Sequence, residues 1–239
     1  MELDLEKIIN IAEEIIKNGG EISRAEETVS RICKASGATK TDIFIIPTLI
    51  SVTATINNKT RTITRRIYSN DLNLGKIEEC NNEARRICNN KTTRKIIDYN
   101  YSTVTSIICI FIATGAFCIY FGGNITDALL SGITGIIISY FPFLKEFNNF
   151  SKTLIESTLA GILSYIPEEI GILNTQPDKI MIGAIMLLIP GMSIGSAIKD
   201  LISGNQISGL FVLTDAIITA GAIALGFAFA TYVFGGFNA

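Results

Sequence analysis

The feature that constrains this chain most is an abrupt fall in charge near Tyr101. Residues 1–101 carry 30 of the 42 charged side chains, and residues 102–239 carry only 12. No charged side chain occurs between residues 99 and 126, a run of 28 residues. Because a helix that crosses a bilayer needs roughly 20 apolar residues, the second region predicts membrane helices and the first does not. We therefore expect two physically different domains.

Further charge-free runs subdivide the second region, 99–239, which we expect to be a transmembrane domain. We predict a membrane all-α bundle of about five transmembrane helices, near residues 102–121, 125–143, 153–173, 180–198 and 209–234. The third segment contains Pro167, so it either continues past the proline or is a short or re-entrant piece. The fourth is interrupted at Pro190-Gly191, because proline removes a backbone donor.

Cationic residues predict the orientation of this bundle. All but Lys179 fall on one side of the expected spans: Lys91, Arg94, Lys95, Lys145, Lys152 and Lys199. The positive-inside rule then places the N-terminus in the cytosol. An odd number of spans leaves the C-terminus outside.

Residues 1–98 predict a small cytosolic α+β domain. Apolar residues recur at helical spacing over 3–16, 22–36 and about 77–88, whereas apolar and polar residues alternate along 50–56. β-Branched runs at 42–46 and 62–67 complete three expected strands, with a hairpin turn at Asn57-Asn58-Lys59.

Composition excludes several classes of function. The net charge is −2 and neither region is strongly basic, so we expect no nucleic acid partner. The chain has no His, and its five cysteines form no C-x-x-C pair, so we expect no metal site and no cofactor. No nucleophile lies beside a base, and we do not expect an enzyme.

Four acidic residues lie in or beside the apolar segments, where a carboxylate is costly unless it faces protein, water or a partner. Asp215 lies deepest, and either belongs to a substrate or ion pathway or forms a bond between helices. Asp127 and Glu156 each open an expected helix, where a carboxylate also complements the helix N-terminus. Asp200 follows Lys199 and either acts in the pathway or forms an interfacial ion pair.

The break at Pro190-Gly191 is a second candidate feature. Transporters bind polar ligands with the backbone groups of broken helices, and Ser193 would add a hydroxyl group. The alternative is a kink that serves packing only.

Small residues recur every four positions along the last expected span, at Ala216, Ala220, Ala224 and Ala228. Such a face permits close helix contact. It predicts either tight packing within the bundle or a subunit interface, including a possible homo-oligomer.

The C-terminal motifs carry a family resemblance. They run in the order Met186-Leu187-Leu188-Ile189-Pro190-Gly191, Ala197-Ile198-Lys199-Asp200-Leu201, Gly204, Ser208-Gly209 and Asp215-Ala216. With Gly20-Glu21-Ile22-Ser23-Arg24-Ala25-Glu26, Pro47, Thr64-Arg65-Arg66 and Phe121-Gly122-Gly123 before them, they resemble the threonine/serine exporter family over nearly the whole chain. Asn205 departs from this pattern where an acidic residue is common, and Asp215 where Glu is expected.

The resemblance implies a bacterial inner-membrane exporter of small hydrophilic metabolites, threonine and serine in some members and dicarboxylates such as succinate in others. Fused members carry a second membrane half, so this chain resembles the larger component of a split exporter with a small membrane subunit as its partner. Asp215 is then a candidate for proton coupling. The alternative is a membrane-anchored sensor or scaffold whose α+β domain is the active part.

Overall fold

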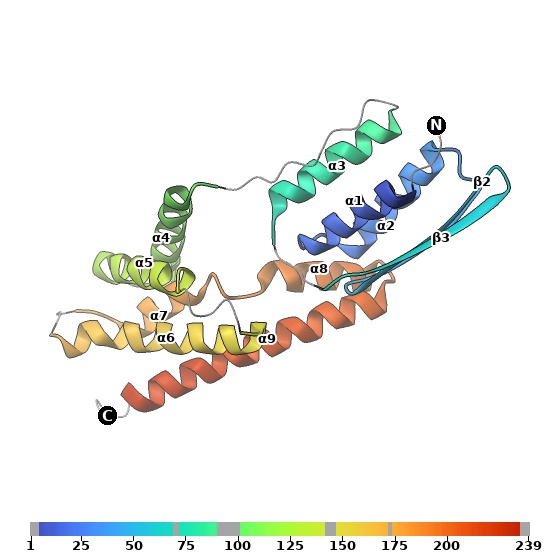
Figure 1. The fold of residues 1–239 in the computed structure, drawn as a ribbon. Coiled ribbons are helices and arrows are strands. Elements are labelled where there is room, and N and C mark those ends of the chain that lie inside the picture. Colours follow the sequence, from blue (N-terminus) through green and yellow to red (C-terminus); the bar gives the residue numbers. More distant parts are fainter. Residues whose placement is uncertain (1–4, 69–71, 90–100, 142–146, 172–173, 235–239) are drawn as a thin grey trace. The chain divides into compact units, whose positions relative to one another are not determined.

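The computed structural model describes residues 5–68, 72–89, 101–141, 147–171 and 174–234. The chain divides into two compact units (Figure 1). Unit 1 comprises residues 1–100 and 191–214, and unit 2 comprises residues 101–190 and 215–239. The expected boundary at residue 98 lies outside the described residues, as do Lys91, Arg94, Lys95 and Lys145, on which the predicted orientation partly depends.

Three helices form the α layer of unit 1: α1 (Leu5–Lys17), α2 (Ile22–Ala35) and α3 (Leu74–Cys88). Each pair of these helices is in contact. Isoleucines at helical spacing give α1 one continuous apolar face, and all of its buried residues lie on that face. The turn after α1 requires glycine at position 20, because a Cβ atom there would collide with Ile15.

The sheet of unit 1 is antiparallel, in the order β1 (Lys40–Ile46), β2 (Leu49–Ile56) and β3 (Lys59–Arg66). Asn57 and Asn58 have φ of 49° and 58°, the left-handed conformation that a two-residue hairpin with a type I′ turn requires. The turn expected at these residues is confirmed. α1 contacts β2 and β3, and α2 contacts β1, so the helices cover one face of the sheet.

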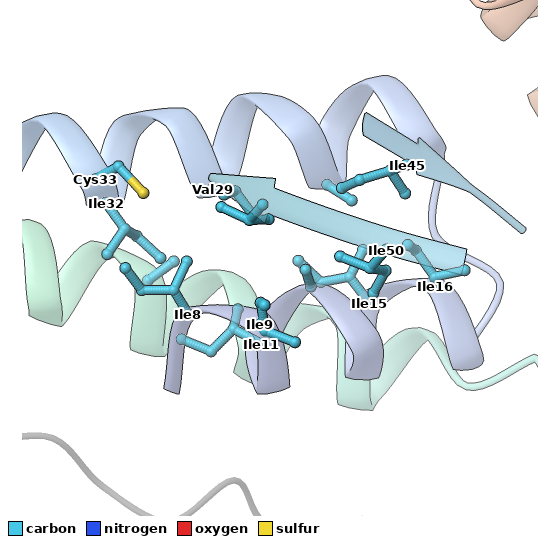
Figure 2. Packing of buried hydrophobic residues seen from close by; sticks show 14 of the residues in the cluster. Ile8, Ile9, Ile11, Ile15, Ile16, Val29, Ile32, Cys33, Ile45 and Ile50 are labelled. Carbon is cyan, nitrogen blue, oxygen red and sulfur yellow. The ribbon is translucent and has the colours of Figure 1, made fainter. Parts of the chain in front are cut away.

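Large aliphatic side chains fill the space between helices and sheet (Figure 2). Ile9 and Ile15 of α1, Ile32 of α2 and Ile50 of β2 are all fully buried. On the opposite face of the sheet, hydroxyl side chains pair across β2 and β3: Ser51 with Thr64, Thr53 with Thr62 and Thr55 with Thr60. Residues 5–68 and 72–88 therefore have an apolar core and a polar sheet face, the arrangement typical of a domain that folds in water.

Every regular element that the structure describes in unit 2 is a helix. It contains α4 (Thr103–Tyr120), α5 (Ile125–Ser139), α6 (Asn149–Glu169), α7 (Pro177–Ile185) and most of α9 (Gln206–Phe234), whose first residues belong to unit 1. Among the described residues, α4 and α9 are long and apolar enough to cross a membrane, and α5 is a shorter apolar helix. The expected count of five spans stays a prediction.

Small residues bring the helices of unit 2 close together. A Cβ atom on Gly183 of α7 would collide with Thr114 and Cys118 of α4 and with Ser131 of α5. Large apolar side chains lie outside instead, for example Ile112, which is 62% exposed. Close helix contact through small residues with aliphatic side chains outward is typical of membrane helices.

The fourth expected span, 180–198, differs from the structure. Two helices, α7 and α8 (Gly191–Ile202), occupy this region, and α8 belongs to unit 1. Pro190 explains the interruption, because it has no N–H to donate and it disfavours helical geometry at the preceding residue. At about 1.5 Å per residue, neither helix alone is long enough to cross a bilayer.

Candidate functional site

The four acidic candidates divide between the two units. Asp200 lies in unit 1, whereas Asp127, Glu156 and Asp215 lie in unit 2. Asp127, Glu156 and Asp200 are buried, and Asp215 is exposed. Burial of the first three requires compensating partners, and the partners differ in each case.

Asp200 on α8 caps the N-terminus of α2, 177 residues earlier in the chain. Its carboxylate accepts hydrogen bonds from the backbone N–H groups of Ile22 (3.4 Å) and Ser23 (3.2 Å). Glu21, the N-cap residue of α2, forms no side-chain cap of its own, and its carboxylate instead pairs with Lys199 at 2.6 Å. Asp200 therefore supplies the negative charge that a helix N-terminus favours.

Three residues that the sequence did not single out as site residues extend this polar cluster. Glu26 on α2 accepts a hydrogen bond from the N–H of Ile45 (3.3 Å) and another from Asn205. Ser208 on α9 donates to the carbonyl of Ile45 (3.3 Å). The sequence marks Glu26, Asn205 and Ser208 as candidates only by their positions within or beside the motifs that resemble the family pattern.

The pKa of Glu26 is raised above its ordinary value. Burial raises its pKa most, and the nearby charge of Asp200 raises it further, although the bonds from Ile45 and Asn205 act in the opposite direction. The cluster in unit 1 therefore holds two carboxylates, those of Glu26 and Asp200, whose negative charges repel each other.

Asp127 connects helix ends in unit 2. Asn124 and Asp127 form a reciprocal capping box at the start of α5, with bonds of 2.8 and 3.0 Å. The second carboxylate oxygen of Asp127 accepts the N–H of Gln176, which precedes α7, at 3.0 Å. The side chain is fully buried and both of its oxygens are hydrogen-bonded, as the helix-terminus interpretation requires.

Glu156 is only 6% exposed and lies on α6, one turn after Lys152. The Nζ atom of Lys152 is 3.8 Å from its carboxylate, beyond normal hydrogen-bond distance. The neighbouring Ser157 faces α9 and donates to the carbonyl of Ala222 (3.4 Å).

The chain passes from unit 2 to unit 1 at the backbone break that follows α7, between Pro190 and Gly191. The N–H of Leu188 bonds to the carbonyl of Ile185 (2.7 Å), and Pro190 follows at the end of unit 2. Gly191 and Ser193 begin α8 in unit 1, and both are exposed.

Asp215 is exposed in the described structure, and no partner of its carboxylate is found among the described residues. Its backbone carbonyl accepts the hydroxyl of Thr219 (2.9 Å). The depth of Asp215 in a membrane stays a prediction.

The packed face of α9 is not the one that the sequence pattern predicted. Ala220, Ala224 and Ala228 are exposed. The buried residues facing α6 are instead Ala222, Gly226 and Ala230: a Cβ atom on Gly226 would collide with Ser157, and Ala230 lies against Gly161. Ala216, the first residue of the predicted ladder, is buried, so the ladder is wrong for packing within the chain only beyond that residue. Its use as a subunit interface stays a prediction.

Neither a metal site nor a disulfide is found among the described residues. Burial raises the pKa of Cys33 to about 11 and that of Cys80 to about 12, so both thiols stay protonated at neutral pH.

Comparison with known proteins gives one match. The family model ThrE, described as "Putative threonine/serine exporter", matches residues 6–234. No curated protein and no solved structure matches the chain significantly. Because the family model spans both units and nearly all of the sequence, this chain belongs to the threonine/serine exporter family of membrane transport proteins.

Proposed function

We propose that this chain is the membrane component of a secondary exporter that moves a small hydrophilic metabolite out of the cell. Family membership supports export of threonine and serine. A dicarboxylate such as succinate is the alternative substrate. In this proposal unit 2 forms the transport path in a bacterial inner membrane, with the N-terminus in the cytosol and the C-terminus outside.

The observation that carries this proposal is the polar interior of unit 2. Asp127, Glu156 and Ser164 are all buried, whereas large aliphatic side chains such as those of Ile112 and Ile133 are exposed. Asp127 caps helix ends, but the buried carboxylate of Glu156 has no such structural partner and would be costly in a helix that only anchors a sensor. A transport path for a hydrophilic substrate requires polar groups inside the bundle.

We assign ion coupling to Asp215 and assembly to a second, small membrane subunit. A carboxylate exposed on an apolar helix is unfavourable against lipid, so a partner helix that packs over Asp215 would remove that cost. Pro190, Gly191, Ser193 and Asp200 stay candidates for the path, and the cytosolic domain stays a candidate for its gate.

Counterflow of labelled threonine, serine and succinate in proteoliposomes tests the proposal, with and without a co-expressed small membrane subunit. We expect movement of at least one solute and a loss of its dependence on the proton gradient in Asp215→Asn. Wild-type dependence of net transport on the proton gradient in Asp215→Asn would exclude the coupling role. No movement of any solute by the wild type would favour the anchored sensor or scaffold.

A further inference from the structure

Glu156 has an unusual lack of hydrogen bonds for a buried carboxylate. It is 6% exposed, yet within the described part of the chain it accepts no hydrogen bond, and its ionic contact is Lys152 at 3.8 Å. The side chain of Lys152 is 48% exposed, so packing does not hold it against the carboxylate. An ionised carboxylate has about four acceptor positions, and because no fully buried side-chain oxygen of the described residues lacks a partner, the Glu156 oxygens keep some access to the surface of unit 2.

The packing of α6 against α7 gives the position of this carboxylate. Ala160, one turn after Glu156, packs with Ala184 of α7 and Ile138 of α5. Gly161 lies against Met181, 3 residues before Ala184. A later residue of α6 therefore meets an earlier residue of α7, and the two helices run antiparallel. One turn back from Ala160, Glu156 is level with residues 186–190, where α7 has ended.

The end of α7 offers carbonyl oxygens at this level. The last carbonyls of a helix lack intrahelical donors and carry partial negative charge. The N–H of Leu188 occupies the carbonyl of Ile185, and Pro190 has no N–H to donate. The carboxylate and these carbonyls are all acceptors, so the region favours a cation and disfavours an anion. Transporters place cations at the carbonyl ends of broken helices.

We propose that Glu156 and the carbonyl end of α7 bind the α-ammonium group of the exported amino acid. This inference rests on the proposed export function and selects among its substrates: threonine and serine carry an ammonium group, and succinate carries only negative charges. Lys152 holds the carboxylate in the empty state, and the substrate ammonium group replaces it.

Matched variants of the ion pair test this site in proteoliposomes. Glu156→Gln keeps the size of the side chain and removes its charge, and we expect the KM for threonine to rise about tenfold or more. Lys152→Met removes the cation that competes with the substrate, and we expect the KM for threonine to fall below that of the wild type. If the pair is only structural, both variants lose transport alike, and the proposal is overturned.

Competition with the wild-type protein keeps the test independent of the stability of the variants. Serinol keeps the ammonium group of serine without its carboxylate, and 3-hydroxypropionate keeps the carboxylate without the ammonium group. We expect serinol to inhibit threonine transport and 3-hydroxypropionate to inhibit it less. The reverse order, or transport of succinate alone, overturns the ammonium site while the export function stands. Absence of all transport instead refutes the export function.

Discussion

The two units bury opposite kinds of side chain. Unit 1 has a continuous core built largely of isoleucine, and its exposed sheet face carries hydroxyl groups. In unit 2 a contiguous cluster of buried apolar residues contains only Ile138, Ala160 and Ala184 among the described residues. Its close contacts are made by glycine, alanine and serine, and its isoleucines mostly face outward.

This difference is the one that folding in water and folding in lipid would produce. In water, burial of aliphatic area supplies the main driving force, so unit 1 places its largest aliphatic side chains inside. In lipid that force between helices vanishes, and close packing through small residues with internal hydrogen bonds replaces it. Four predictions test the contrast, from the largest expected effect to the smallest.

Truncation of a core isoleucine in unit 1 should have the largest effect. Ile9 is fully buried, so we expect Ile9→Ala to lower the free energy of unfolding by about 2–5 kcal/mol. Hydrogen exchange of β2 amides in the full chain measures this loss. The control is Ile112→Ala on α4, which is 62% exposed and should change stability by no more than about 0.5 kcal/mol. Equal effects of the two variants would contradict the contrast.

Enlargement of a small residue should be the most damaging kind of change in unit 2. Gly226 packs against Ser157 and the backbone of Thr158, so Gly226→Leu should separate α6 from α9 at a cost of about 1–3 kcal/mol. Thermal unfolding in detergent checks this. Ala224→Leu, on the exposed face of the same helix, is the matched control and should leave the unfolding temperature nearly unchanged.

Removal of the Asp200 carboxylate tests whether unit 1 depends on residues from the C-terminal part of the chain. Asp200→Ala leaves the N–H groups of Ile22 and Ser23 without their acceptor, and we expect a loss of about 1–2 kcal/mol. Faster hydrogen exchange at the start of α2 reports it. Asp200→Asn keeps one acceptor oxygen and should lose less. Unchanged exchange in Asp200→Ala would show that the cap contributes nothing.

Glu26 and Glu13 of unit 1 should contribute to the free energy of unfolding with opposite dependences on pH. The pKa of Glu26 is raised, so its contribution is fully present below its ordinary value of 4.5 and is lost as pH rises through the folded-state pKa. Burial alone would raise the pKa of Glu13, but bonds from and charges of Lys17 and Arg65 outweigh it and lower the pKa. Its contribution is present above 4.5 and is lost as pH falls through the lowered value.

Thermal unfolding of Glu26→Gln and Glu13→Gln across this pH range measures the two contributions. Relative to the wild type, Glu26→Gln should gain stability as pH rises, and Glu13→Gln should lose stability as pH rises. The same direction in both variants would refute the assignment.

Local patterns predicted the elements of unit 1 well. The alternation along β2 and the turn at Asn57-Asn58 are confirmed because strand pairing across a two-residue loop depends mainly on neighbouring residues. The helix pattern of α1 likewise predicted its buried face. Prediction was weaker for α9, where apolar residues surround the helix and give no preferred side. The alanine spacing alone therefore selected the wrong face.

By itself, the sequence determined the charge boundary near Tyr101, the elements of unit 1, the interruption at Pro190 and the exporter family, because each depends on composition or on nearby residues. Only the tertiary structure decided that Asp200 caps α2, that Gly226 rather than the alanine ladder packs on α6, and that Glu156 is level with the end of α7. These facts join residues far apart in the chain. Which distant groups meet depends on how whole helices pack, and no local pattern records that.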